Sequence, residues 1–273
     1  MARTNRRCID PVALASLLLT APVWLVGQGR EEFVAAARRG TESYQDRSAA
    51  IAAGYRPMGP ESPAMGQHWV HPGLLIQGVV DPARPQILSY ATIAGRPVLV
   101  GVAYAVPAGA PIPDGPAPRE AWHVHDGTLV EEAVQPDHDA HRAVGAGPAM
   151  GGVAVLHAWI YVANPAGLFA SDNWALPFVR LGLEPPARYP EAAARALALA
   201  AGGVPFYVEQ LGSTTDLPVD AARTIARILA ARADTVGRWL ASRPARPLDL
   251  AEIEWLTTLW TAAWSEARAA ARS

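Results

Sequence analysis

The chain lacks most of the residues and motifs from which the common catalytic and metal sites of proteins are built. Its 273 residues include one cysteine, Cys8, so an intramolecular disulfide and a thiolate-based zinc or iron–sulfur site are excluded. A GxSxG elbow, a P-loop, a GxGxxG turn after a strand and an HExxH helix are also absent. The sequence therefore gives no direct signal for a nucleophilic hydrolase, a nucleotide-binding enzyme or a zincin protease.

An excess of charge of one sign is lacking as well. The chain has no lysine, and its 23 basic residues, all arginine, are nearly balanced by 25 acidic residues. Binding of nucleic acid needs a basic excess that neutralises phosphates. We therefore expect no nucleic-acid partner.

Long apolar runs are confined to the N-terminus. Arg3, Arg6 and Arg7 precede Pro11–Val26, a stretch of 16 mostly apolar residues. A basic start followed by an apolar run of this length is typical of a secretory signal, and the run is short for a membrane span. We predict that residues 1–28 form a signal peptide or N-terminal anchor of a periplasmic or extracellular protein, with no other membrane span. The alternative is a cytoplasmic protein in which this segment packs on the core as a helix.

Histidine is missing from two-thirds of the chain and concentrated in the rest. All seven histidines lie between His68 and His157, in the sequences HWVH, WHVH, HDAH and LHAW. Acidic residues accompany them: Asp126, Glu131, Glu132, Asp137 and Asp139. Imidazole is the commonest metal ligand in proteins, and carboxylates complete many nitrogen and oxygen sites. This concentration is the sharpest chemical signal in the sequence.

Strand geometry decides which histidines can act together. Residues two apart on a strand point the same way, so His123 and His125 can bind one metal ion from a single strand. By the same rule, His157 shares a face with Trp159 and Tyr161. His68 and His71 would point to opposite faces of a strand, and only one of them can join the others. Pro72 favours extended backbone at His71. We favour His68 as the ligand, because it follows the tight Met65-Gly66 turn.

The predicted metal site is His68, His123, His125 and His157, with Asp126, Glu131 or Glu132 as oxygen ligands or supporting partners. A set of three or four imidazoles suits Zn, Cu, Fe or Ni without choosing among them. The alternative is four unconnected histidines in the core and on the surface. The sequence assigns no role to His71, and it assigns none to His138 and His141, which share a face only on a helix.

Segment patterns predict an α+β fold. Residues 30–53 favour helix ending at Gly54, whereas residues 56–66 are rich in proline and glycine and are expected to form a loop. Strands are expected at 67–70, 74–76, 86–93, 97–106, 122–125 and 153–163, with Ala94-Gly95 joining a hairpin. These strands predict a mostly antiparallel sheet or partial barrel. We divide the chain into residues 1–28, a histidine-bearing domain over 29–182 and a helical region over 183–273.

The C-terminal region is alanine-rich and has helical periodicity. Two helices joined by SRPARP, the second starting near Leu248, are expected to form an antiparallel hairpin. Trp255, Trp260 and Trp264 recur at helical spacing on the second helix. Such a stripe is more often core or subunit interface than a ligand face, which allows a homo-oligomer formed through these helices.

Three stretches of the sequence stand out as motifs: MGQHWVHP (Met65–Pro72), DPARPQILSY (Asp81–Tyr90) and LHAWIYVANPAGLFASDN (Leu156–Asn173). About half the chain, from residue 44 to 173, resembles an uncharacterised bacterial family, often exported, with MGxHWVxP and LHxWxxxxNPxGxFA motifs. The resemblance implies that His68, His157 and one histidine of WHVH are shared. It implies no reaction, and the proline-rich insert, the HDAH pair and the C-terminal helices set this chain apart from simpler members.

Taken together, the sequence predicts an exported metal-binding protein with a multi-histidine site. One alternative is a metal-dependent enzyme, hydrolase or oxygenase, in which Glu131 or Asp126 acts as general base on metal-bound water. Such an enzyme would need an aromatic pocket, for which the candidates are Trp69, Trp122, Trp159 and Tyr161. A second alternative is a metal-free scaffold or assembly protein.

Overall fold

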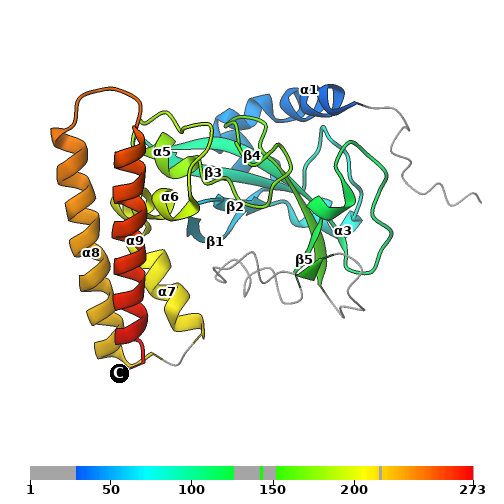
Figure 1. The fold of residues 1–273 in the computed structure, drawn as a ribbon. Coiled ribbons are helices and arrows are strands. Elements are labelled where there is room, and N and C mark those ends of the chain that lie inside the picture. Colours follow the sequence, from blue (N-terminus) through cyan, green and yellow to red (C-terminus); the bar gives the residue numbers. More distant parts are fainter. Residues whose placement is uncertain (1–28, 126–141, 144–151, 215–216, 273) are drawn as a thin grey trace, which may run out of the picture.

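The computed structural model describes residues 29–125, 142–143, 152–214 and 217–272, and it has the predicted α+β architecture (Figure 1). A curled antiparallel sheet forms a partial barrel, with helices from the N-terminal segment on one side and a helical C-terminal region beside it. The helices are α1 (Arg30–Thr41), α2 (Arg47–Ala53), α3 (Pro72–Gln77), α5 (Leu176–Arg180), α6 (Glu191–Ala198), α7 (Val204–Thr214), α8 (Val219–Ser242) and α9 (Leu250–Ala270). Short 3-10 turns span Glu42–Gln45 and Arg119–Ala121, and a π-turn spans Leu199–Gly203.

The sheet has the strand order β1-β2-β3-β4-β7-β5-β6, and every neighbouring pair is antiparallel. Its strands are β1 (Arg56–Ser62), β2 (Gly66–Val70), β3 (Ile87–Ile93), β4 (Arg96–Pro107), β5 (His123–His125), β6 (Arg142–Ala143) and β7 (Val153–Ala158). The predicted β3–β4 hairpin is present, and Ala94 and Gly95 both have positive φ, at 49° and 73°. Two positive φ angles in a row give the backbone twist that a two-residue hairpin turn needs.

One face of the sheet packs on the N-terminal helices and forms the main core. Phe33 of α1 lies edge-on to Tyr104 of β4, with ring centroids 5.5 Å apart, and both rings are fully buried. Arg38 ties the same helix to the segment just after β7 by donating from Nε and one terminal nitrogen to the Ile160 carbonyl, at 2.9 and 2.7 Å. Burial of each large aromatic side chain stabilises the fold by roughly 1.5–3 kcal/mol.

Three segments differ from the sequence expectation. Residues 56–62 form the edge strand β1 rather than a loop, because an edge strand tolerates prolines whose missing N–H faces away from the ladder. Leu74–Ile76 lie in helix α3 rather than a strand: the His71 side chain accepts a hydrogen bond from Leu74 N at 3.2 Å, and Pro72 and Gly78 occupy favoured end positions. Strand β7 ends at Ala158, five residues earlier than the range 153–163 predicts.

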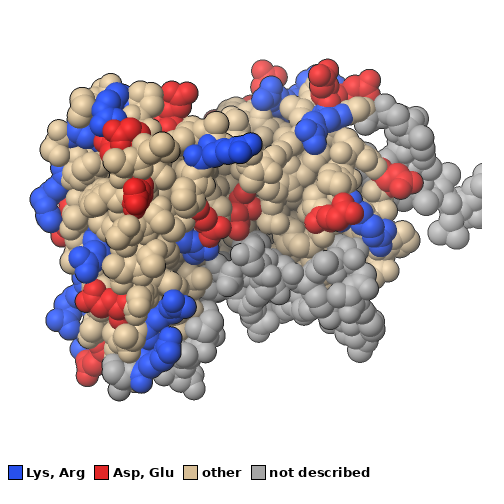
Figure 2. All heavy atoms as spheres, viewed as in Figure 1, with Lys and Arg blue, Asp and Glu red and all other residues tan. Residues whose placement is uncertain are grey.

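The C-terminal helices have a core of their own. Helices α8 and α9 pack side by side as the expected antiparallel hairpin, joined across the pair by Trp239 and Trp255 with ring centroids 5.0 Å apart. Trp260 is 6 % exposed and lies 4.7 Å from the Tyr207 ring of α7. The tryptophan stripe therefore packs against other helices of the same chain. On the face drawn in Figure 2, arginine and acidic side chains are interspersed over the described residues rather than gathered by sign.

Candidate functional site

Three strands bring the four predicted ligands to the same face of the sheet. His68 lies on β2, His157 on β7, and His123 and His125 on β5. Their register partners include Ser89 for His68 and Ala103 for His157. This face is opposite to the one that packs against α1, where Leu88, Val102 and Leu156 belong to the main core. The alternation of the strands thus separates a histidine face from an apolar face.

The central strand β4 differs sharply between its two faces. Beside the histidines it presents the small residues Gly101, Ala103 and Ala105, whereas the alternate positions carry larger ones such as Tyr104. A Cβ at Gly101 would lie 3.0 Å from both the Ala158 carbonyl oxygen and the Trp159 ring. Small side chains here leave room for imidazole rings above the middle of the sheet.

The four imidazoles form a chain of neighbouring rings. Ring centroids are 5.3 Å apart for His68 and His157, 5.4 Å for His157 and His123, and 4.9 Å for His123 and His125. Two imidazoles bound to one tetrahedral ion, with metal–nitrogen bonds of about 2.0–2.1 Å, have centroids roughly 5 Å apart. Each neighbouring pair therefore has the separation of two ligands of one ion. Among the described residues, however, no three His, Cys, Asp or Glu side chains are already placed to hold an ion together.

Burial keeps the ring of His68 neutral. Its Nε2 atom is buried without a hydrogen-bond partner among the described residues, and desolvation lowers the pKa of His68 to about 4. The other three side chains are buried as well, with His157 only 1 % exposed. Neutral imidazole is the form that binds metal, so at neutral pH His68 needs no deprotonation to become a ligand.

The pH dependence of stability should report on His68. Its pKa is lower in the folded protein than the value of about 6.5 in the unfolded chain, so the unfolded state binds the proton first as pH falls. In metal-free protein, His68 should cost about 2 kcal/mol of unfolding free energy between about pH 7.5 and pH 5. The variant His68→Gln does not titrate, so its urea-denaturation free energy should fall less over this range. Parallel pH profiles of the two proteins would contradict the burial of this ring.

His71 lies apart from the four-ring chain. Its Nδ1 accepts the hydrogen bond that starts α3, and its ring meets Tyr55 edge-on with centroids 5.2 Å apart. The HWVH pair is thus divided, with one histidine on the histidine face and the other at a helix start. Several predicted residues lie outside the described part of the chain: Asp126, Glu131, Glu132, Asp137, His138, Asp139 and His141.

The aromatic residues expected around a catalytic pocket do not gather at the histidines. Trp159 does stack beside His157, with centroids 6.0 Å apart and planes 24° apart. Trp69 and Trp122 belong to the main core on the other face. Tyr161 falls beyond the end of β7, and its hydroxyl lies 2.8 Å from that of Thr41 on α1. The expected common face of His157 and Tyr161 is therefore wrong, because the strand does not continue that far.

Comparison of the chain with models of protein families, with curated proteins and with solved structures gave no match in any of the three. No helix in the described ranges combines the length and the apolar character that crossing a bilayer requires.

Proposed function

We propose that this protein binds a transition-metal ion through His68, His123, His125 and His157. The observation that supports this most directly is the spacing of the four rings, since three successive pairs are separated by 4.9–5.4 Å. His157 and His123 form the central pair, with His68 and His125 on either side. Rotation of at least one flanking ring about its side-chain torsions brings a third nitrogen to the ion.

The imidazole nitrogens of the proposed ligands indicate which class of metal ion the site would bind. The proposed ligands are all imidazoles, which suit Zn, Cu, Fe and Ni and are poor ligands for Mg or Ca. The single cysteine of the chain precedes the apolar N-terminal run, so a thiolate set is not available to bind a softer ion. The export that we predict from residues 1–28 belongs to this proposal, with metal handling outside the cytoplasm as its setting.

The test is the metal content of protein purified without an affinity tag. Aliquots are incubated with Zn²⁺, Cu²⁺, Ni²⁺ or anaerobic Fe²⁺, desalted and measured by elemental analysis. We expect about one ion per chain for at least one metal, and loss of that ion in the double variant His123→Ala/His125→Ala.

A matched control guards against loss of the fold. His71→Asn removes a histidine outside the four-ring chain while keeping an acceptor for Leu74 N. It should bind as much metal as the unmodified protein, and circular dichroism should show that the double variant still unfolds cooperatively. Equal metal in the double variant, or none in the unmodified protein with any of the four ions, would overturn the proposal.

A further inference from the structure

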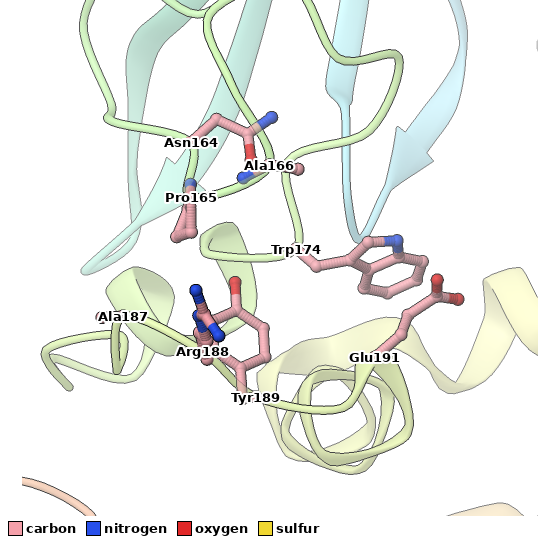
Figure 3. Close-up of a pocket in the computed structure, with 8 residues that line it drawn as sticks. All are labelled: Asn164, Pro165, Ala166, Trp174, Ala187, Arg188, Tyr189 and Glu191. Carbon is pink, nitrogen blue, oxygen red and sulfur yellow. Dashed lines mark hydrogen bonds between the residues drawn. The ribbon is translucent and has the colours of Figure 1, made fainter.

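A cavity lies away from the histidines, where the turn after β7 meets the helical region (Figure 3). Its volume is about 270 Å³. It is lined by eight residues: Asn164, Pro165, Ala166, Trp174, Ala187, Arg188, Tyr189 and Glu191. These come from two segments, one closing the sheet and one leading into α6, so no single sequence motif describes the cavity.

Residues behind the cavity fix the positions of its walls through hydrogen bonds and a cation–π contact. The Asn164 amide donates to the Asp172 carbonyl at 2.8 Å and accepts from Ala166 N at 3.0 Å, which fixes the turn carrying Pro165. The guanidinium of Arg195 lies 4.5 Å from the centre of the Trp174 ring. These contacts form the cavity before any ligand arrives, which lowers the entropic cost of binding.

The wall opposite Pro165 carries two unused donors. The ring of Tyr189 packs 4.6 Å from that of Phe178, and its hydroxyl and the neighbouring Arg188 guanidinium lie on the same side of the cavity. Within the described ranges, neither the Arg188 side chain nor the Tyr189 hydroxyl has a hydrogen-bond or ion-pair partner. Burial raises the pKa of Tyr189 to about 12, so its hydroxyl keeps its proton at neutral pH and can donate.

The charges around the cavity favour an anion. Glu191 stands at the other end beside Trp174, and its carboxylate is paired with Arg195 Nε at 2.5 Å. Its charge is thus compensated by Arg195, whereas Arg188 has no ion-pair partner among the residues that the structure describes. A guanidinium next to a phenolic hydroxyl is a good partner for a carboxylate, which accepts from both at once.

We propose that this cavity binds a small organic carboxylate with a flat apolar body. The carboxylate accepts from Arg188 and Tyr189, and the body lies against Trp174 and Pro165. The cavity is slightly smaller than the usual sites of drug-sized ligands, which suits a single ring rather than a drug-sized molecule. This site is separate from the proposed metal site, and neither depends on the other.

The probe is phenylacetate, compared with its neutral isostere phenylacetamide. The indole N–H signal of Trp174 is observed in two-dimensional NMR spectra of the full chain and is assigned by its absence in Trp174→Phe. We expect phenylacetate to shift this signal saturably, with a dissociation constant of roughly 1 mM or below. Phenylacetamide should bind about tenfold more weakly, because it loses the charge-assisted bonds to Arg188.

Two arginine variants complete the experiment. Arg188→Gln keeps the length and polarity of the side chain but removes its charge, and should weaken phenylacetate binding about tenfold. Arg268→Gln changes an exposed arginine on α9 and should leave binding unchanged. The proposal is overturned if the Trp174 signal does not shift, if acid and amide bind alike, or if both arginine variants behave alike.

Discussion

Replacing Gly40 by alanine is expected to lower the free energy of unfolding by about 3 kcal/mol or more. Gly40 lies in helix α1, and a Cβ built there would stand 1.9 Å from the carbonyl oxygen of Ala83 and 2.5 Å from its carbon. Both are backbone atoms, so no side-chain rotation relieves the overlap. Helix α1 would have to move away from the loop that contains Ala83.

The loop that Gly40 approaches is itself held in place, which is why we expect a large effect. The hydroxyls of two core tyrosines donate to its carbonyls: Tyr104 to Pro82 at 2.9 Å and Tyr55 to Pro85 at 2.6 Å. Moving the loop would break these bonds. Moving the helix would expose Phe33, which is fully buried under the sheet.

Gly237→Ala is the matched control for this prediction. Gly237 also lies inside a helix, α8, but it is exposed and a Cβ there would meet nothing within 4 Å. Alanine is a better helix former than glycine, so this variant should be more stable by up to about 1 kcal/mol. Urea denaturation of both variants measures the contrast. Equal stability of the two would contradict the close packing of α1 on residues 81–84.

The same glycine shows where sequence reasoning succeeds and fails. Composition predicts one helix over residues 30–53, but the helix runs through Gly40 only as far as Thr41 and a 3-10 turn follows at Glu42–Gln45. The reason for this glycine is a contact with a residue more than forty positions away, which no local pattern reveals. The end at Gly54 was predictable, because its φ of 106° is a local requirement.

For the strands too, the sequence predicts what depends on local residues and fails where distant neighbours decide. The β3–β4 hairpin is local, and its turn residues and alternation place it correctly. The edge strand β1 and the helix α3 are set by what lies next to them, so proline content and a Leu-Leu-Ile run mislead there. The antiparallel sheet as a whole was predictable because most of its strands carry their own hydrophobic pattern.

Of the candidate site, the sequence supplies the residue types and the pairing of His123 with His125 on one strand. It does not supply the strand order, in which β7 lies between β4 and β5 and so sets His157 between His68 and His123. The cavity near Trp174 gave no sequence signal, since Arg188 and Tyr189 lie in an irregular segment without a motif.

Replacing His157 by phenylalanine is expected to abolish metal binding while keeping the fold, with a loss of affinity of at least about a hundredfold. Its ring lies between the rings of His68 and His123, which come from two other strands, with centroids 5.3 and 5.4 Å away. Phenylalanine has a ring of similar size, so it can fill the same buried position without the nitrogen donors.

The contrast between two ring substitutions makes this prediction decisive. His157→Phe removes the central donor, whereas His125→Phe removes the last ring of the four-ring chain, whose centroid lies 4.9 Å from that of His123. If the ion is held around the His157–His123 pair, the first variant should lose binding and the second should lose less, as measured by competition with a chromophoric chelator. Equal affinities of His157→Phe and the unmodified protein would exclude the four-ring chain as the metal site.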